Sequence, residues 1–443
     1  MDEVSLTTDN RFTLADSPIN VEILKHYLEK YSDKKLAAEI SHGFEFGFPL
    51  HYTGPRLPRD SKNLRSVDDH PEIVRQKIQT ELDSRRIAGP FDERPISTLR
   101  ISPIGLVEKK TPGEYRLIHH LSSPEGQSLN DFIAPDLCSV KYSSFDQAIH
   151  MIQDMGRGCL LGKLDIKSAF RLLPVSPSEF DQLGFVFDGK FYYDKAMPFG
   201  CSISCASWEK VSTFLECITK LESQNGDLKH YVDDFLFAGE PGTDHCLNIM
   251  NTFISCAGQM GFPIASEKTV WPTTRIVYLG LELDSIEMVV RMPKEKIDEL
   301  ISKIQFVQNA KRVTLKVMQQ LIGSLNFATR VIVPGRPFLR RLINSTKGIS
   351  NPHHHLRVNK GMQQDLAMWL DFFTHFNGIS VFHDRFWVNN EDVELFTDSA
   401  AGPGMGFGAI FGKKWTHGIW PQVWHDKGIT KDITVLELFP ILV

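Results

Sequence analysis

The 443-residue sequence is poor in cysteine and has no long apolar run. Its seven cysteines include no Cys-x-x-Cys pair, which favours free thiols in a reducing compartment over a disulfide framework. No 18-residue apolar stretch exists, which excludes a membrane-spanning helix, so we expect no membrane partner. The first residues lack a basic region followed by an apolar stretch, which argues against a secretory signal. We therefore expect an intracellular protein of the cytoplasm, the nucleus or both.

The chain also lacks an excess of basic residues. Its 49 Lys and Arg stand against 54 Asp and Glu, and this net charge of −5, taken as a total, argues against nucleic-acid binding. Hydrophobic residues make up 42% and charged residues 23%, which excludes a disordered or collagen-like chain and allows a large buried core. The length predicts two to four domains, since a typical domain has about 100–200 residues.

The charge is distributed unevenly along the chain. The 65 residues from Leu300 to Gln364 contain eleven Lys or Arg and no Asp or Glu, whereas the remainder has a net charge of −16. Such a basic block would attract nucleic-acid phosphates through Coulomb forces and counterion release. A solvated helical face that happens to be basic explains the composition equally well.

Hydrophobic spacing predicts a mixed chain of helices and strands. A first helix is expected to start at Ser17-Pro18, and helical structure is expected again from Pro293 through the basic block. Other expected helices span residues 71–86, 144–155, 204–223 and 244–260. Expected strands span 101–108, 115–121, 159–166 and 275–284, with hairpins at 184–193 and 231–238. Three further strands are expected at 393–399, 405–411 and 414–420.

Three aspartates stand in unusual surroundings. Asp165 ends a hydrophobic strand, and Asp233 and Asp234 are adjacent within an apolar and aromatic stretch. Asp is depleted in strands and neighbouring carboxylates repel, so a tight turn, a cation or a metal is expected to compensate. Mg²⁺ prefers oxygen ligands and keeps several waters, so two or three carboxylates suffice to hold it, and a pair of ions can support an in-line displacement. The alternative is an Asx turn at a hairpin tip.

The motifs around these aspartates resemble those of retroelement reverse transcriptases, which are RNA-directed DNA polymerases. The resemblance covers about residues 90–345 and keeps the order and spacing of that family. The motifs that carry it are Val107–Ile118, Leu164–Phe170, Met197–Gly200, Tyr231–Asp234, Gly261–Lys268 and Tyr278–Leu283.

The resemblance implies an α+β fold, a right-hand polymerase with fingers, a ferredoxin-like palm and a thumb, followed by a linker and a partial RNase H-like α/β domain. The expected boundaries are 1–70 for an N-terminal accessory region, 71–285 for fingers and palm, 286–350 for the thumb, 351–390 for a connection or linker, and 391–443 for the truncated RNase H-like domain.

The resemblance also implies roles for the aspartates. Asp165, Asp233 and Asp234 would be catalytic and, together with the backbone carbonyl of Ile166, would hold two Mg²⁺ ions, for which Mn²⁺ is able to substitute. Asp165 and Asp233 would bind both ions. Asp234 would contribute less, near the primer 3′-hydroxyl.

A nucleotide-binding set follows from the same resemblance. It comprises basic residues of the fingers hairpin, two aromatic residues, a glycine and a downstream lysine: Lys109, Lys110, Arg116, Phe170, Phe199, Gly200 and Lys268. Lys109 or Lys110, with Arg116, would neutralise the triphosphate, and the alternative is a solvated hairpin tip.

The other members of this set have separate roles in the family. Phe170 corresponds to a steric gate that excludes a ribose 2′-hydroxyl, with a core Phe as the alternative. Phe199 stands where some relatives have Gln, so its contact has to be apolar or stacking. Gly200 would allow close backbone approach to the base. Lys268 is a candidate proton donor to pyrophosphate, with a surface Lys as the alternative.

Two downstream segments indicate the partners. Tyr278, Leu279 and Gly280 resemble the primer grip. Residues 319–327 resemble the thumb helix, which follows the minor groove of a duplex through phosphates and sugars. The expected partners are an RNA or DNA template with its primer, and dNTPs; the oligomeric state is left open.

The C-terminal region resembles the start of an RNase H domain. Asp398 and Glu437 match its first two carboxylates, but the family needs two further aspartates and the sequence ends at Val443. We therefore expect a truncated domain without RNase H activity.

The N-terminal stretch, through Gly54–Arg59 and Gly89–Phe91, most resembles the polymerases of DIRS-like elements, whose DNA integration uses a tyrosine recombinase, with a gypsy-like element as the next choice. The leading hypothesis is thus a retrotransposon reverse transcriptase. A decayed or domesticated element protein that binds nucleic acid without catalysis is the alternative, and a group II intron maturase is a third.

Overall fold

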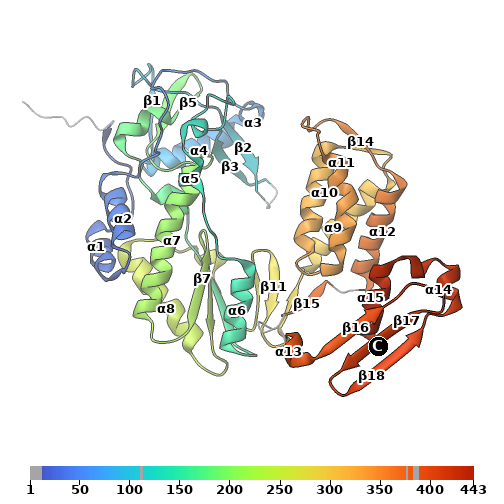
Figure 1. Cartoon of the computed structure of the whole chain (residues 1–443). Coiled ribbons are helices and arrows are strands. Elements are labelled where there is room, and N and C mark those ends of the chain that lie inside the picture. The colour runs from blue at the N-terminus through green and yellow to red at the C-terminus, as the bar shows by residue number, and fades with distance from the viewer. Residues whose placement is uncertain (1–11, 110–112, 376–377, 383–388) are drawn as a thin grey trace, which may run out of the picture. The chain divides into compact units, whose positions relative to one another are not determined.

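The computed structural model describes residues 12–109, 113–375, 378–382 and 389–443. The chain forms two compact units, residues 1–382 and 383–443, and Figure 1 shows the elements of both. None of the described helices is long and apolar enough to cross a membrane.

A four-stranded antiparallel sheet and three helices form the centre of the first unit. The strand order is β7-β8-β4-β9. The elements are β4 (Leu160–Asp165), α6 (Phe145–Met155), α7 (Ile203–Glu222), β7 (Asp227–Tyr231), β8 (Asp234–Gly239), α8 (His245–Met260) and β9 (Val270–Thr273). Except for β9, which was not expected, they correspond to the helices and strands expected for this region, although the β7–β8 hairpin begins four residues before the predicted start at residue 231.

Side-chain alternation along β8 shows how the sheet is covered. Phe235 and Phe237 join the hydrophobic core that contains α7 and α8, whereas Leu236 and Ala238 join the core that contains α6. The sheet therefore has helices on both faces, as Figure 1 shows. Helix α6 has the predicted ends, because Ser144 forms a capping box with Gln147 and Gly156 follows the last residue.

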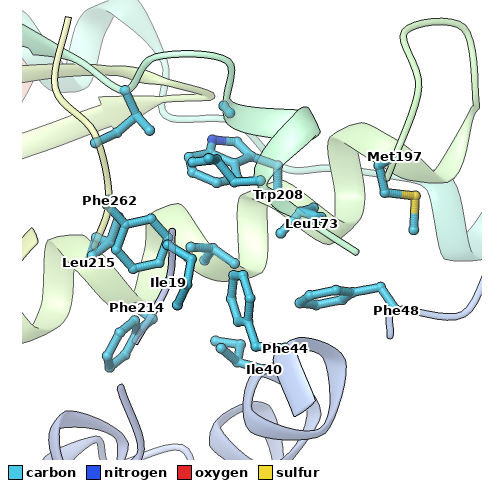
Figure 2. Packing of buried hydrophobic residues seen from close by; sticks show 14 of the residues in the cluster. Ile19, Ile40, Phe44, Phe48, Leu173, Met197, Trp208, Phe214, Leu215 and Phe262 are labelled. Carbon is cyan, nitrogen blue, oxygen red and sulfur yellow. The ribbon is translucent and has the colours of Figure 1, made fainter. Parts of the chain in front are cut away.

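Two N-terminal helices cover the outer side of α7 and α8. They are α1 (Val21–Lys30) and α2 (Lys34–Phe46). Only α1 was expected from the sequence. Asn20 and Asp33 cap the two helices with their side chains. Figure 2 shows Ile40 and Phe44 of α2 facing Phe214 and Phe262, so this region shares the core of the central sheet.

Two small sheets and three helices precede and interrupt the central sheet. One sheet has the order β1-β6-β5 and the other pairs β2 with β3. The elements are α3 (Arg65–Asp69), α4 (Pro71–Asp83), β1 (Ile87–Phe91), β2 (Ile104–Glu108), β3 (Tyr115–His119), α5 (Pro135–Cys138), β5 (Gly184–Phe187) and β6 (Lys190–Asp194). Apart from α5, which packs against α7, they contribute to a separate hydrophobic cluster that includes Ile78, Ile104 and Phe185.

The strand expected over residues 275–284 is wrong in one respect, because the segment is a hairpin. It consists of β10 (Arg275–Tyr278) and β11 (Leu281–Asp284). Leu279 and Gly280 both have positive φ, 46° and 82°, the conformation of a two-residue hairpin turn. Strands β12 (Val289–Arg291) and β15 (Ile379–Val381) extend this sheet.

The basic block is mostly helical, as expected, but it also contains a strand pair. The elements are α9 (Lys294–Asn309), β13 (Arg312–Thr314), α10 (Leu315–Ala328), α11 (Arg340–Thr346), β14 (His355–Arg357) and α12 (Lys360–His375). Their common core includes Ile304, Leu325 and Trp369. Helix α12 thus lies inside the stretch expected as a linker; the five predicted domain boundaries themselves stay predictions.

The second unit has the three strands expected at the C-terminus, in the order β16-β17-β18. Its elements are α13 (Asn390–Val393), β16 (Leu395–Ser399), β17 (Gly406–Phe411), β18 (Lys414–Ile419), α14 (Gln422–Asp426) and α15 (Ile433–Leu442). The hydroxyl of Ser399 donates to the carbonyl of Leu436 at 2.8 Å and so joins β16 to α15.

Candidate active site

The turn between β7 and β8 carries Asp233 and is held from the side by α7. Tyr231 pairs with Asp234 across the hairpin, which leaves Val232 and Asp233 in the turn. Val232 has φ of 58°, a costly conformation for a β-branched residue. Its carbonyl accepts hydrogen bonds from Trp208 Nε1 at 3.0 Å and Ser212 Oγ at 2.6 Å. These contacts from α7 hold the turn in a conformation it would not adopt alone.

The structure brings the three predicted carboxylates together. Asp165 lies directly opposite Asp234 in the pairing of β4 with β8. The amide of Ile166 donates to the carbonyl of Asp233 at 3.1 Å, which joins the end of β4 to the turn. An Asx turn alone does not explain this arrangement, because the carboxylates come from two adjacent strands.

Burial and mutual repulsion mark the cluster as electrostatically unfavourable. Burial, and then the carboxylate of Asp165, raise the pKa of Asp233 to about 6. Burial also raises the pKa of Asp234. Both shifts mean that the folded chain resists placing these negative charges together and that a bound cation would relieve the repulsion.

Lys268 lies against the first aspartate. Its ammonium donates to both oxygens of Asp165 at 2.9 Å. Burial opposes the charge, but the bonds to Asp165 raise the pKa of Lys268 above its ordinary value. Lys268 is therefore part of the acidic cluster rather than a free surface lysine. Among the described residues, no three His, Cys, Asp or Glu side chains converge as ligands on one point.

The carbonyl of Ile166 was predicted as a further ligand. Ile166 forms an antiparallel bridge with Ile264. The bridge uses the amides of Lys167 and Ala265, which donate to the carbonyls of Pro263 and Asp165 at 2.8 Å. The carbonyl of Ile166 takes no part in this bridge.

Aromatic and basic residues predicted for nucleotide binding lie against one another. The rings of Phe170 and Phe199 lie 5.5 Å apart between centroids. The guanidinium of Arg116 lies over the ring of Phe199, 4.7 Å from its centroid. Phe170 and Phe199 are both half-buried and both line the cavity described below, and Phe170 also packs against the main hydrophobic core.

The fingers hairpin and Gly200 differ in part from expectation. Lys109 donates to Glu114, the residue before β3, at 3.0 Å, so its charge is partly compensated within the hairpin. Lys110 lies outside the described residues. Gly200 has φ of 113°, and a Cβ there would stand 2.0 Å from the carbonyl oxygen of His119. Close packing against this strand end already explains the glycine, whereas an approach to a base stays a prediction.

Several of the predicted site residues border one cavity of about 870 Å³. Its walls come from the central sheet, the fingers hairpin and the loop before β9. The predicted site residues that line it are Lys109, Arg116, Asp165, Ile166, Phe170, Phe199, Asp233 and Lys268. Carboxylates, an aromatic pair and cations thus share a space large enough for a small-molecule ligand.

A buried ion network behind the cavity was missed by the sequence analysis. Arg171 follows Phe170 and donates to Glu81 at 2.8 Å, and its guanidinium also pairs with Asp194 at 2.8 Å. His119 contacts the other oxygen of Asp194 at 3.2 Å. Burial alone would raise the pKa of Asp194, but Arg171 and His119 hold it below its usual value. A charged residue within the apolar run Ala169–Leu173 was the available signal.

The predicted primer grip lies in the β10–β11 hairpin. Tyr278 is buried, and Leu279 and Gly280 form the turn. The ammonium of Lys296 lies 4.5 Å from the ring centroid of Phe327 on α10. A Cβ on Gly280 would stand 2.1 Å from the same ammonium, so this turn lies close to both α9 and α10.

The structure divides the basic block into paired and unpaired cations. Lys303 pairs with Glu299 at 2.6 Å and Arg341 pairs with Asp365 at 2.9 Å. Arg312 and Arg357 lie directly opposite each other across β13 and β14. We call the exposed cations around this strand pair the basic tip. Its members are Lys311, Arg312, Lys316, Arg357 and Lys360. None of these side chains forms an ion pair within the described part of the chain.

The second unit places the RNase H-like pair on two elements in contact. Asp398 lies on β16 and Glu437 on α15. Each is one residue away from the hydrogen bond between Ser399 and Leu436. The two positions are therefore neighbours in the fold, and their role stays a prediction.

Comparison with known proteins gives a family match for the segment that carries the site. Residues 107–283 match the family model of reverse transcriptase (RNA-dependent DNA polymerase). The Gag-Pro-Pol polyprotein of Mason-Pfizer monkey virus is 24% identical over 326 residues, which cover 70% of this chain and 16% of the polyprotein. Protein P of duck hepatitis B virus (strain Germany/DHBV-3) is 28% identical over 166 residues, 37% of this chain and 20% of that protein. The chain thus spans a fifth or less of these relatives.

Solved structures share the fold. A foamy viral protease-reverse transcriptase in complex with RNA/DNA hybrid has a TM-score of 0.56 and 16% identity, covering 94% of this chain and 56% of that chain. A second structure of this protein type, with double-stranded DNA, has a TM-score of 0.55 and 16% identity, with 94% and 72% covered. The expected α+β polymerase fold is thereby confirmed.

Proposed function

We propose that the chain, which carries a reverse transcriptase domain over residues 107–283, is an RNA-directed DNA polymerase that joins a dNTP to a primer 3′-hydroxyl. The observation that carries the proposal is the meeting of Asp165, Asp233 and Asp234 at the end of two paired strands, beside one large cavity. The match of residues 107–283 to the reverse transcriptase family model supports the same activity.

The carboxylates fit a pair of divalent cations, with Mg²⁺ as the proposed ion and Mn²⁺ as its substitute. The raised pKa of Asp233 and Asp234, which comes mainly from burial, is consistent with a cluster whose negative charge Lys268 and Lys163 only partly compensate. Carboxylates bind Mg²⁺ together with water and substrate phosphates, so two or three are enough. Bound there, divalent ions would supply charge stabilisation for the attacking hydroxyl and the leaving pyrophosphate. The turn at Val232 and the bridge at Ile166 hold the carboxylates in place for these ions.

The cavity walls fit a nucleoside triphosphate. Arg116 and Lys109 line the cavity as cations, and the ring pair of Phe170 and Phe199, which Arg116 contacts, lines it with apolar surface. A guanidinium binds phosphate oxygens in a planar fork, and aromatic rings stack on bases or exclude a bulky sugar substituent. We assign the triphosphate to these cations and the sugar to Phe170.

The partner we propose is a template with its primer. The similar foamy viral structures hold double-stranded DNA or an RNA/DNA hybrid. In this chain, the cations of the basic tip would contact phosphates without reading bases. The element that encodes the chain is proposed to be a retrotransposon; its assignment as DIRS-like stays a prediction from the N-terminal sequence.

The test is primer extension on an RNA template with dNTPs and Mg²⁺. We expect extension by the wild-type chain, its loss in Asp233→Asn, and its retention in Asp146→Asn, an exposed acid in the first turn of α6. Binding of the primed template without any extension would instead support a decayed element protein that only binds nucleic acid.

A further inference from the structure

A buried histidine joins the strand before the catalytic turn to helix α7. The imidazole of His230 lies between two carboxylates of α7. Its Nδ1 is 2.6 Å from Glu216 Oε2, and its Nε2 is 3.1 Å from Glu209 Oε1. The side chain of His230 is only 6% exposed. Both ring nitrogens face acceptors, so the doubly protonated, cationic imidazole is the form that satisfies them.

Neighbouring carboxylates stabilise the positive charge of His230. Burial alone would favour the neutral ring, but Glu209 and Glu216 raise the pKa of His230 to about 9. Lys220 also contacts Glu216, at 2.8 Å, and Lys229 lies 3.6 Å from it. Asp227 pairs with Lys220 at 2.7 Å. From β8, the neighbour of His230 is the uncharged ring of Phe235.

Glu209 depends on the imidazole more than Glu216 does. Its second oxygen is buried and has no hydrogen-bond partner among the described residues. Without a cation at position 230, Glu209 would be a buried carboxylate with its charge uncompensated, which is a large cost.

The same face of α7 also holds the turn that follows His230. Trp208 and Ser212 donate to the carbonyl of Val232, and they lie one helical turn apart, interleaved with Glu209 and Glu216. Helix α7 therefore contacts the hairpin on both sides of Tyr231. A slip of one residue in β7 would turn every following side chain to the opposite face, Asp233 included.

We propose that His230, as a cation held by Glu209 and Glu216, is a positioning residue that locks β7 onto α7 and thereby fixes the place of Asp233 for nucleotide transfer. This inference rests on the proposed polymerase function. It assigns the histidine a role in the rate of transfer, beyond the stability of the sheet.

The experiment is single-turnover incorporation of one dNTP on a primed template, comparing the wild-type chain with His230→Gln and Glu209→Gln. The matched control is His245→Gln, which removes a second histidine–glutamate pair, His245 with Glu240 at 2.5 Å, at the start of α8. The amplitude of the reaction counts correctly folded enzyme, while its rate constant reports the geometry of the site. The pH profile and the Mg²⁺ concentration at half-maximal rate are measured on the same proteins.

We expect His230→Gln to lower the rate constant between about tenfold and about a hundredfold at unchanged amplitude per folded molecule, as a misplaced reacting group does. The Mg²⁺ needed for half-maximal rate should rise, and His245→Gln should match the wild type. The wild-type rate should decline as the pH rises through about 9, where His230 loses its proton, and His230→Gln should lack this decline.

A loss of amplitude and thermal stability with an unchanged rate constant would overturn the proposal, because it would mean that His230 only stabilises the fold. An equal alkaline decline in His230→Gln would do the same. Failure of the wild-type chain to incorporate any nucleotide would count against the polymerase function instead.

Discussion

The ammonium of Lys268 donates to both carboxylate oxygens of Asp165, at 2.9 Å each, although 103 residues separate them in sequence. A divalent cation that binds Asp165 has to share this carboxylate with Lys268 or displace it. Lys268→Gln should therefore lower the Mg²⁺ concentration at half-maximal rate by about two- to fivefold, the effect of losing a partly exposed ion pair of about 0.5–1 kcal/mol. Lys190→Gln, which removes a cation paired with Asp92 on the surface, should leave it unchanged. A higher Mg²⁺ requirement in Lys268→Gln would contradict competition at Asp165.

The second prediction concerns stability and pH in the absence of divalent ions. Burial and Asp165 raise the pKa of Asp233 to about 6, above its unfolded value, so the folded chain favours the protonated form. The ionised carboxylate then opposes folding above pH 6, and this cost disappears as the pH falls below the unfolded pKa of about 4. In EDTA at pH 8, Asp233→Asn should be more stable than the wild type by about 2 kcal/mol. Thermal unfolding at pH 8 and pH 4 should show this difference shrinking at the lower pH; a constant difference would mean that repulsion is not its cause.

Phe170 should control the choice of sugar. It lies in the cavity, and its ring contacts Phe199 at 5.5 Å between centroids. Phe170→Ala should raise the incorporation of ribonucleotides relative to deoxyribonucleotides by about tenfold or more, since removing a clash is worth at least about 1.4 kcal/mol in discrimination. Phe199→Ala is the comparison, because it removes the neighbouring ring and should weaken dNTP binding without changing sugar preference. Unchanged discrimination in Phe170→Ala would place the gate elsewhere.

Gly200 should be intolerant of any side chain. Its φ of 113° disfavours other residues, and a Cβ would stand 2.0 Å from the carbonyl oxygen of His119. Gly200→Ala should destabilise the chain by about 2 kcal/mol or more through strain and overlap. Gly113 also has positive φ, at 81°, but open space around it, so Gly113→Ala should cost less in chemical denaturation. Equal losses in both variants would show that strain alone, and not contact with His119, accounts for the effect.

Features set by neighbouring residues could be predicted from the sequence. Helix α6 has its cap at Ser144 and its end at Gly156, and the turn at Val232 and Asp233 falls where the apolar stretch predicted a hairpin. The hairpin at Leu279 and Gly280 was read as one strand because a non-glycine residue with positive φ leaves no clear sequence signal. Gly280 within an alternating apolar run was the hint that was available.

Contacts between distant segments could not be predicted in the same way. Arg171 meets Glu81, 90 residues away, and Lys268 meets Asp165 only because the loop before β9 lies beside β4. Residue types suggested both sites, but which cation reaches which carboxylate depends on how strands and loops pack in three dimensions. The fit of α7 against Val232 and His230 is likewise visible only in the folded chain.

The basic tip should account for much of the salt dependence of template binding. Arg312 lies opposite Arg357 across β13 and β14, an arrangement of like charges that is unfavourable unless an external anion compensates it. A variant with glutamine at four tip positions should reduce the slope of log affinity against log salt by about 3.6 when all four contact phosphates, because each phosphate contact contributes about 0.9. The four positions are Lys311, Arg312, Lys316 and Arg357. Binding of a primed duplex is measured between low and physiological ionic strength.

The matched control removes the same charge from ion-paired cations elsewhere on the first unit. Its four positions are Lys25, Arg75, Lys190 and Lys210. This control should keep the wild-type slope, since those cations already have carboxylate partners, whereas the tip cations have none within the described residues. Equal slopes in the wild type, the tip variant and the control variant would mean that the basic tip binds no phosphate. The absence of acidic residues over 300–364 would then reflect only a solvated surface. A reduced slope confined to the tip variant, with single-turnover incorporation intact at saturating template, would separate template holding from catalysis.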